Sequence, residues 1–264
     1  MLRPRVIPCL LLKDRRLVKT VRYRDPRYIG DPINVARIFS DKQVDELLLL
    51  DISRTPEARP IDFNLVGDIA SECYMPLTYG GGIRSLQDIR DLLALGVEKV
   101  VLGTAAIETP ELVTEASRTF GTQSIVVSID AAKDSFGRYQ VFGRCGTRTT
   151  MLNPVDHARC MQSAGAGELL VNSIDRDGSL KGYDLDLVGA VAGAATVPVI
   201  ACGGAGSIRD FVAAVREGGA SAVAAGSLFV LHGKHRAVLV TYPDHRTRQE
   251  IPGLSVHRDG HAEL

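Results

Sequence analysis

Gly81-Gly82-Ile83-Arg84-Ser85-Leu86-Gln87-Asp88 returns 122 residues later as Gly203-Gly204-Ala205-Gly206-Ser207-Ile208-Arg209-Asp210. Each copy joins a Gly-rich turn to a helix start, because a serine is followed three residues later by an aspartate. Residues 46–54 return as 168–176 at the same spacing, and residues 103–104 return as 226–227 one residue further on. Three regions that repeat at nearly one spacing are hard to obtain by chance, so the chain is interpreted as two duplicated halves.

Eight short apolar runs lie along the two halves, with helical patterns between most of them. The runs are continuous rather than alternating, which is typical of strands that are covered on both faces. They are Val6–Leu12, Glu46–Ile52, Pro76–Tyr79, Lys99–Leu102, Ser124–Asp130, Glu168–Ile174, Val197–Cys202 and Ala222–Gly226. Helix starts are predicted at Asp31-Pro32, Ser85, Thr109-Pro110-Glu111, Asn153-Pro154 and Ser207. We therefore predict a single α/β domain, a (β/α)₈ TIM barrel with an internal half-barrel repeat. An open doubly wound sheet is the alternative, but it does not explain the repeat.

The composition excludes several classes of protein. The chain has 264 residues with 31 Lys and Arg against 31 Asp and Glu, so its net charge of zero does not favour a nucleic-acid binder. Neither a signal peptide nor a convincing membrane span is found, and no membrane association is expected. Five cysteines without a Cys-x-x-Cys pair fit reduced thiols in the cytoplasm. We assign residues 1–243 to the barrel and residues 244–264 to a polar, flexible tail.

Small-residue turns follow strands in both halves. In a TIM barrel such turns lie at the C-terminal face, where glycines let the backbone approach an anion and helix starts direct N–H groups toward it. We therefore expect two phosphate sites on opposite sides of the barrel mouth, and a ligand with a phosphate at each end. The alternative is that the glycines only turn the chain. The candidate phosphate-binding residues are Gly82, Gly103, Thr104, Gly178, Gly203, Gly204, Gly226 and Ser227, with Lys19 as a nearby cation.

A family resemblance rests on motifs spread over residues 3 to about 230. The motifs are Val6-Ile7-Pro8-Cys9-Leu10, Gly30-Asp31-Pro32, Asp45-Glu46-Leu47, Leu50-Asp51-Ile52, Gly80-Gly81-Gly82-Ile83-Arg84, Ile129-Asp130, Asp175-Arg176-Asp177-Gly178 and Gly182-Tyr183-Asp184-Leu185. In combination the sequence resembles the HisF family, the cyclase subunit of imidazole glycerol phosphate synthase. The resemblance implies a glutaminase partner at the N-terminal face of the barrel. It also implies that ammonia crosses the barrel to a bisphosphate substrate, with neither a cofactor nor a metal.

The resemblance implies two catalytic aspartates, at the ends of strands 1 and 5, and the chain keeps one of them. The strand-5 position is Asp130, whereas the strand-1 position is Leu11, which cannot transfer protons. Asp14 comes three residues later in the loop and cannot simply replace it. Loss of one acid–base group costs about 10²–10⁴ in rate, so cyclisation by this chain is in doubt. Asp51 is expected to point into the mouth and orient the substrate.

The resemblance also maps a charged ring onto the barrel floor. The ring consists of Arg5, Glu46, Lys99 and Glu168, two cations and two anions at N-terminal strand ends. Such a ring can part to admit ammonia and is the expected ammonia gate. The alternative is a structural salt-bridge ring that closes the floor.

A narrower resemblance concerns the HisF-like branch associated with acetamidino sugar modification in surface polysaccharide synthesis. It rests on Leu10-Leu11-Leu12-Lys13, residues 17–21, Ala70-Ser71-Glu72-Cys73, Asn172-Ser173-Ile174-Asp175 and residues 232–243. It implies a HisH-like glutaminase partner and delivery of ammonia to a sugar amidotransferase. Three hypotheses follow: ammonia delivery for acetamidino sugar formation, a true cyclase for histidine biosynthesis, and a non-catalytic scaffold for the glutaminase. His232 and His235 are interpreted as part of a basic helix start rather than as metal ligands.

Overall fold

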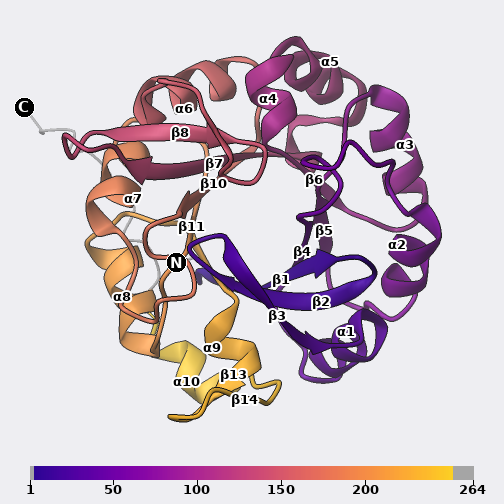
Figure 1. Ribbon diagram of the computed structural model, residues 1–264, viewed down its shortest axis with the longest axis vertical. Helices are drawn as coiled ribbons and strands as arrows, with labels where there is room; N and C mark the ends of the chain where they lie inside the picture. The colour runs from indigo at the N-terminus through magenta and orange to yellow at the C-terminus, as the bar shows by residue number, and fades with distance from the viewer. Residues whose placement is uncertain (1–2, 252–264) are drawn as a thin grey trace, which may run out of the picture.

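Eight parallel strands close into a barrel in the computed structural model, which describes residues 3–251 (Figure 1). Strand pairing runs in the order β1–β4–β5–β6–β7–β10–β11–β12 and returns to β1, and pairing between β7 and β10 joins the two halves. The strands are β1 (Arg5–Lys13), β4 (Leu47–Asp51), β5 (Leu77–Gly80), β6 (Lys99–Leu102), β7 (Ile125–Lys133), β10 (Glu168–Ser173), β11 (Val199–Cys202) and β12 (Ala222–Ala225). The predicted (β/α)₈ barrel is confirmed.

Helices surround the barrel, as Figure 1 shows. The longer ones are α1 (Pro32–Asp41), α2 (Phe63–Ala70), α3 (Leu86–Ala94), α5 (Glu111–Phe120), α6 (Pro154–Ser163), α7 (Leu185–Ala192) and α8 (Ile208–Arg216). Short ones are α4 (Thr104–Glu108), α9 (Ser227–Val230) and the 3₁₀ turn η1 (Thr122–Ser124). The helix starts predicted between the apolar runs, at Asp31, Ser85, Thr109, Asn153 and Ser207, are confirmed. Asp31 and Asn153, for example, each accept a backbone N–H of the first turn and precede a proline at the first helical position.

The strands are buried on both faces, which explains their continuous apolar runs. Outward-facing residues such as Val6 pack against the helices in one large core. Inward-facing residues fill the barrel with a second, smaller apolar cluster. That inner cluster consists of Ile7, Cys9, Leu48, Val101, Val126, Leu170, Ile200, Cys202, Ala222 and Ala224, with Leu11 and Leu50 packed against it.

The sequence repeat is also a structural repeat. Asp88 accepts hydrogen bonds from the backbone N–H groups of Arg84 and Ser85 at 2.8 and 3.0 Å. Asp210 does the same for Gly206 and Ser207, both at 2.8 Å. The two turns that precede these helices therefore have matching local geometry.

Glycine is required by the backbone at two of the turn positions. Gly81 and Gly204 both have φ of +114°, and a Cβ on either would lie 2.2 Å from a backbone carbonyl oxygen. At these two positions chain packing alone demands glycine, whether or not a phosphate binds.

Two hairpins extend the sheet at the mouth and are repeat mates, because they follow β1 and β7. The first consists of β2 (Arg16–Val21) and β3 (Arg24–Gly30), and the second of β8 (Tyr139–Gly143) and β9 (Arg148–Thr149). Neither hairpin was predicted from the sequence. Figure 1 shows them on opposite sides of the barrel opening.

The basic segment after α9 is a third hairpin, so the predicted helix start at His232 and His235 is wrong. β13 (Leu231–His232) pairs with β14 (Ala237–Val238), and Gly233 with φ of +70° makes the turn. Beyond it, the expected tail begins with α10 (His245–Gln249), where Arg248 lies 2.7 Å from Asp45. The rest of that segment, from residue 252 on, lies outside the described residues.

Candidate functional site

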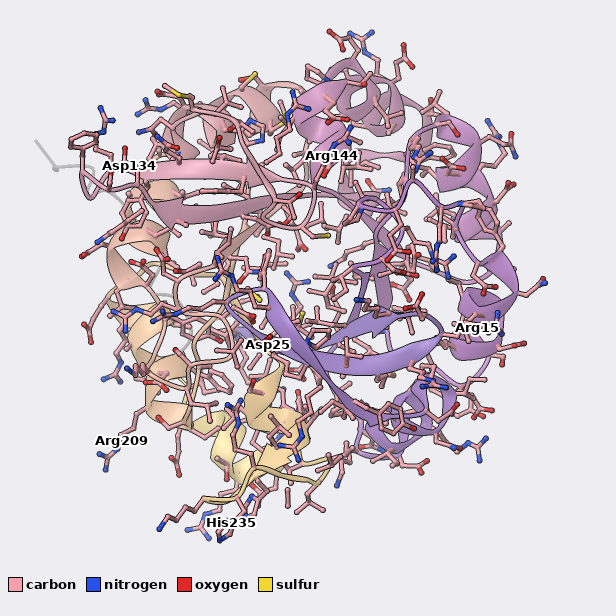
Figure 2. All side chains as sticks on the ribbon, in the orientation of Figure 1. Arg15, Asp25, Asp134, Arg144, Arg209 and His235 are labelled. Carbon is pink, nitrogen blue, oxygen red and sulfur yellow. The ribbon has the colours of Figure 1, made fainter. Side chains whose placement is uncertain are left out.

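A cavity of about 640 Å³ opens at the C-terminal ends of the strands and is lined by both halves of the barrel. All eight candidate phosphate-binding residues line it, together with Lys19, Asp51 and Asp130. Figure 2 labels Asp25 on the first hairpin and Arg144 after β8, which lie on opposite sides of the mouth. The positions predicted from the two repeated turns therefore meet in one space, as TIM-barrel geometry requires.

In the first half of the barrel, some polar groups of the two turns already form hydrogen bonds within the protein. The hydroxyl of Thr104 accepts the backbone N–H of Arg144 at 2.8 Å, and the N–H of Gly82 donates to the Thr55 hydroxyl at 3.1 Å. Gly103 differs, because a Cβ there would meet only the Ser128 Cβ, at 3.7 Å. Contacts with neighbouring atoms therefore do not demand glycine at that position, and the turn has open space beside it.

The second-half turns combine a buried hydroxyl with a nearby cation. Ser227 is buried, and its hydroxyl has no hydrogen-bond partner among the described residues. A Cβ on Gly226 would lie 3.2 Å from Cε of Lys19, so the lysine side chain passes directly over this turn. Lys19 itself is buried, with Nζ 2.7 Å from Oδ1 of Asp177.

Asp177 fastens the first hairpin to the loop after β10. Besides Lys19, its carboxylate accepts the Thr20 hydroxyl at 2.9 Å and the backbone N–H of Tyr23 at 3.4 Å. Its carbonyl oxygen accepts the N–H of Arg22 at 3.0 Å. These contacts hold the hairpin across the mouth and bring Tyr23 into the cavity.

Asp130 lies on β7, at the polar side of the mouth, and is surrounded by hydrogen-bond donors. The Ser128 hydroxyl donates to it at 2.9 Å, and Tyr23 and Asn172 are its other side-chain hydrogen-bond partners. Burial raises the pKa of Asp130, while the bonds from Ser128 and Tyr23 oppose that rise. Burial, followed by the charge of Asp130, raises the pKa of Tyr23 well above its usual value, so the phenol keeps its proton and donates it.

β1 and β4 present two apolar side chains, Leu11 and Leu50, to the mouth. Leu11 lies on β1 beside Leu50 of β4 and packs against the inner apolar cluster. Asp14 lies beyond the end of β1 at φ of +48° and is paired with Arg59 at 2.7 Å. It therefore serves a loop contact and does not occupy the strand-end position of Leu11.

The carboxylate of Asp51 forms its hydrogen bonds within its own loop. It is 2% exposed, and its carboxylate accepts the N–H and hydroxyl of Ser53 at 3.0 and 2.7 Å. Its other oxygen accepts Nε of Arg54 at 2.7 Å. Both oxygens are used in shaping the β4–α2 loop, so an interaction with substrate would have to compete with these bonds.

The four predicted ring residues meet at the barrel floor in a closed cycle of ion pairs. Arg5 bridges Glu46 and Glu168 at 2.5 Å each, and Lys99 bridges the same two carboxylates at 3.0 and 3.1 Å. Glu46 is further fixed by the Thr78 hydroxyl at 2.6 Å. The cycle lies directly below the inner apolar cluster, because the four residues are at N-terminal strand ends.

The polar residues of the mouth that were not predicted as site residues include Tyr23, Asn172 and Asp177. Asn172 lies near the end of β10 and Asp177 lies just after that strand. Both belong to motifs that carry the resemblances, so their positions could have indicated them. Tyr23 gives no such signal, because it reaches the mouth only through a hairpin that the sequence did not predict.

Comparison with known proteins agrees with this geometry. Residues 5–236 match the family described as Histidine biosynthesis protein. A Pseudomonas aeruginosa protein named for imidazole glycerol phosphate synthase subunit hisF2 is 52% identical over 244 residues, which cover 92% of this chain and 97% of that protein. The chain belongs to the HisF family. A Leptospira interrogans HisF is 44% identical over 252 residues, covering 95% and 99% of the two chains. A Vibrio vulnificus protein named for subunit hisF3 is 44% identical over 244 residues, covering 92% and 94%.

Membership of the HisF family implies a HisH-type glutaminase as partner in a heterodimer. Within residues 3–251, no helix combines the length and hydropathy that a membrane crossing needs. The same part of the chain contains no group of three or more His, Cys, Asp or Glu residues placed to hold a metal ion.

Proposed function

We propose that this HisF-type chain is the synthase-side subunit of a glutamine amidotransferase complex that supplies ammonia for acetamidino sugar formation in surface polysaccharide synthesis. The observation that carries the proposal is the contrast between the two ends of the barrel. The floor keeps its complete ring of alternating charges, whereas the mouth has Leu11 where a second proton-transfer group would stand. A conduit for ammonia needs the first feature and can lack the second.

The interior suits a small neutral molecule. Ammonia that passes the ring of Arg5, Glu46, Lys99 and Glu168 enters a space lined by apolar side chains. An ammonium ion would lose its hydration there, and nothing in the inner apolar cluster carries an opposite charge. The interior therefore favours neutral ammonia over its protonated form, which is also the nucleophilic form.

The mouth suits a ligand with separated phosphates. Its two sets of turns lie in opposite halves of the barrel, and each half carries a hydroxyl at the matching position, Thr104 and Ser227. Lys19 supplies a cation beside the second set and could exchange Asp177 for a phosphate oxygen. In this proposal the sugar amidotransferase uses the ammonia.

The second candidate is a true cyclase in histidine biosynthesis. It is favoured by Asp130, whose raised pKa suits acid–base chemistry, and by the paired turns. It is opposed by Leu11, because general acid–base catalysis at this mouth would have to work with one carboxyl group.

Two assays separate these functions. The first supplies the histidine-pathway ribotide with ammonium salt, and turnover near that of an aspartate-bearing cyclase would contradict our proposal. The second supplies the glutaminase complex with amide-labelled glutamine and follows the label into an amidino sugar formed by the sugar amidotransferase. We expect label transfer in the second assay and little turnover in the first.

A variant of the charged ring distinguishes both of these functions from that of a non-catalytic scaffold. Substitution of Lys99 by methionine should slow product formation driven by glutamine, while product formation driven by added ammonium salt continues. A chain that only holds and activates the glutaminase predicts that the ring variant leaves glutamine-driven product formation unchanged.

A further inference from the structure

Two cysteine side chains meet inside the upper part of the barrel. Cys9 lies on β1 and Cys202 on β11, and both are buried in the inner apolar cluster, with exposed fractions of 7% and 6%. The two thiols form a side-chain hydrogen bond with each other. Both residues also line the mouth cavity, which connects the pair to the mouth. Because sulfur binds soft metal ions, a thiol pair at a cavity is a candidate ligand set.

The backbone keeps these two cysteines from forming a disulfide, and both are free thiols. β12 lies between β1 and β11 and pairs with each of them. Neighbouring strands are about 4.8 Å apart, so two strand spacings separate the Cα atoms by more than the limit of about 7 Å for a disulfide. The two thiols therefore face each other without being able to join directly.

A metal ion between the two sulfurs suits this spacing better than a direct bond. A disulfide needs sulfurs about 2.0 Å apart, whereas two metal–sulfur bonds of about 2.3 Å allow up to about 4.6 Å. Within residues 3–251, no group of three or more His, Cys, Asp or Glu residues is placed to hold an ion. A structural zinc ion takes four protein ligands, so a pair of thiols favours the soft ion Cu(I) instead.

Lys19 supplies a positive charge beside the pair. A Cβ on Gly226 would lie 2.9 Å from the carbonyl oxygen of Cys9 and 3.2 Å from Cε of Lys19, so the lysine stem passes close to β1. The hydrogen bond with Cys9 and burial raise the pKa of the Cys202 thiol well above its usual value, and the charge of Lys19 opposes that rise. Asp177, the partner of Lys19, acts in the opposite direction. Two thiolates with one monovalent ion carry a net negative charge, which Lys19 offsets in part.

We propose that Cys9 and Cys202 form a two-coordinate site for a soft monovalent metal ion such as Cu(I), at the inner end of the mouth cavity. On binding, each S–H bond breaks, each sulfur forms one bond to the ion, and two protons leave to the solvent. No electron is transferred, because copper enters and stays as Cu(I). The site is independent of the proposed function, since neither ammonia nor a phosphorylated ligand takes part in it.

The test titrates the reduced full chain into Cu(I) without oxygen, in an excess of bicinchoninate, a chelator whose copper complex is coloured. A single thiol competes poorly with the chelator, whereas two thiolates that bind the same ion compete well. We expect the colour to fall until about one copper ion per chain has been transferred. No loss of colour, or transfer that continues well beyond about one ion per chain, would overturn the site.

Variants assign the copper to the two cysteines. Cys9→Ser and Cys202→Ser should each lower the copper affinity at least about tenfold, because each removes one of two ligands. Cys145→Ser and Cys160→Ser are the controls and should keep the wild-type affinity. Cys145 lines the same cavity but donates to the carbonyl oxygen of Ile52 at 3.5 Å, and Cys160 is exposed on α6. Wild-type affinity in Cys202→Ser would contradict the assignment.

X-ray absorption of the copper-loaded wild-type chain decides the question if a serine variant does not fold. The spectrum should show two sulfur neighbours around copper and no nitrogen or oxygen ligand, because the pair lies in an apolar cluster. A third sulfur would mean that another cysteine takes part, and a nitrogen or oxygen ligand would place the ion outside the cluster. Either result would overturn the two-cysteine site.

Discussion

The hydroxyl of Tyr23 lies 2.5 Å from Nδ2 of Asn172, although 149 positions separate the two residues in the chain. Tyr23 lies in the turn between β2 and β3 at φ of +61°, a conformation that L-residues rarely adopt. The contacts of the hairpin with Asp177 stabilise that turn. The bond thus joins a first-half hairpin to a second-half strand and makes the phenol part of the wall around Asp130.

Tyr23→Phe should raise the pKa of Asp130. Burial already raises that pKa, and a hydrogen bond from Tyr23 opposes the rise by stabilising the charged carboxylate. Removing the hydroxyl removes the opposing effect, so Asp130 should take up its proton at a higher pH. Carboxyl ¹³C chemical shifts followed through a pH titration measure this directly.

Tyr28→Phe is the control for that titration, because Tyr28 lies on the same hairpin but is 58% exposed. An unchanged Asp130 titration in Tyr23→Phe would mean that the phenol does not donate to Asp130 in solution.

Leu11→Asp should restore cyclase chemistry if the rest of the mouth still fits the ribotide. A second carboxyl group would stand across the mouth from Asp130, and a positioned acid–base group contributes about 10²–10⁴ in rate. We expect turnover of the ribotide with ammonium salt to rise by about 10²-fold or more in the variant. Leu11→Asn is the matched control, because it introduces a polar side chain of similar size that cannot transfer protons. Equal activity of the two variants would indicate that the pocket itself has changed.

Sequence periodicity predicted the barrel because its strands are buried on both faces and its halves are duplicated. The backbone requires glycine at turn positions such as Gly81 and Gly204. The internal repeat makes these turns recognisable in the sequence. The ring of Arg5, Glu46, Lys99 and Glu168 came from the family resemblance, and the structure brings its members together because strand ends are fixed points of the fold.

Contacts of the mouth could not be predicted in the same way. Lys19 and Tyr23 belong to a hairpin whose second strand is mostly exposed and whose first strand mixes buried and exposed residues, so no continuous apolar run marks it. Asp51 lines the mouth, where it was expected, and its role toward a substrate stays a prediction. Its bonds to Ser53 and Arg54 depend on the loop conformation, which spacing does not encode. The sequence shows which polar groups are present, but it does not show which of them form hydrogen bonds with one another across the fold.

Lys99→Met should destabilise the barrel floor. Glu46 is 2% exposed and would keep only Arg5 and the Thr78 hydroxyl as partners. Removing one partner from a buried ionic network leaves the remaining charges under-compensated, so we expect the free energy of unfolding to fall by about 1–3 kcal/mol. Urea denaturation measures the loss, and Lys181→Met on the exposed loop after β10 is the control. Equal midpoints for both variants would show that the ring contributes nothing to stability.

His157 should make stability depend on pH. It is 5% exposed on α6, and burial lowers its pKa below the ordinary value of 6.5. As the pH falls through 6.5, the unfolded chain binds a proton that the buried imidazole does not, so the folded state loses stability. The limiting slope for one proton is about 1.4 kcal/mol per pH unit.

His157→Leu should reduce that slope, measured from urea denaturation at several pH values between about 7.5 and 5.5. The comparison with wild type isolates His157 from other groups that titrate in the same range. His235→Leu, at an exposed position of the third hairpin, should retain the wild-type slope. A wild-type slope in His157→Leu would mean that the imidazole is protonated equally in both states.

Gly103→Ala and Gly204→Ala should separate a ligand role from a backbone role. Alanine at position 204 would need φ of +114° and place its Cβ 2.2 Å from the carbonyl oxygen of Gly182, so we expect a loss of at least about 2 kcal/mol in unfolding free energy. At position 103 the Cβ would meet only Ser128 at 3.7 Å, and the loss should stay below about 1 kcal/mol. If Gly103 is nevertheless kept small for a phosphate, its alanine variant should bind inorganic pyrophosphate or a bisphosphate more weakly in calorimetric titration, with its fold intact. Unchanged affinity in Gly103→Ala would move the first-half phosphate site away from this turn.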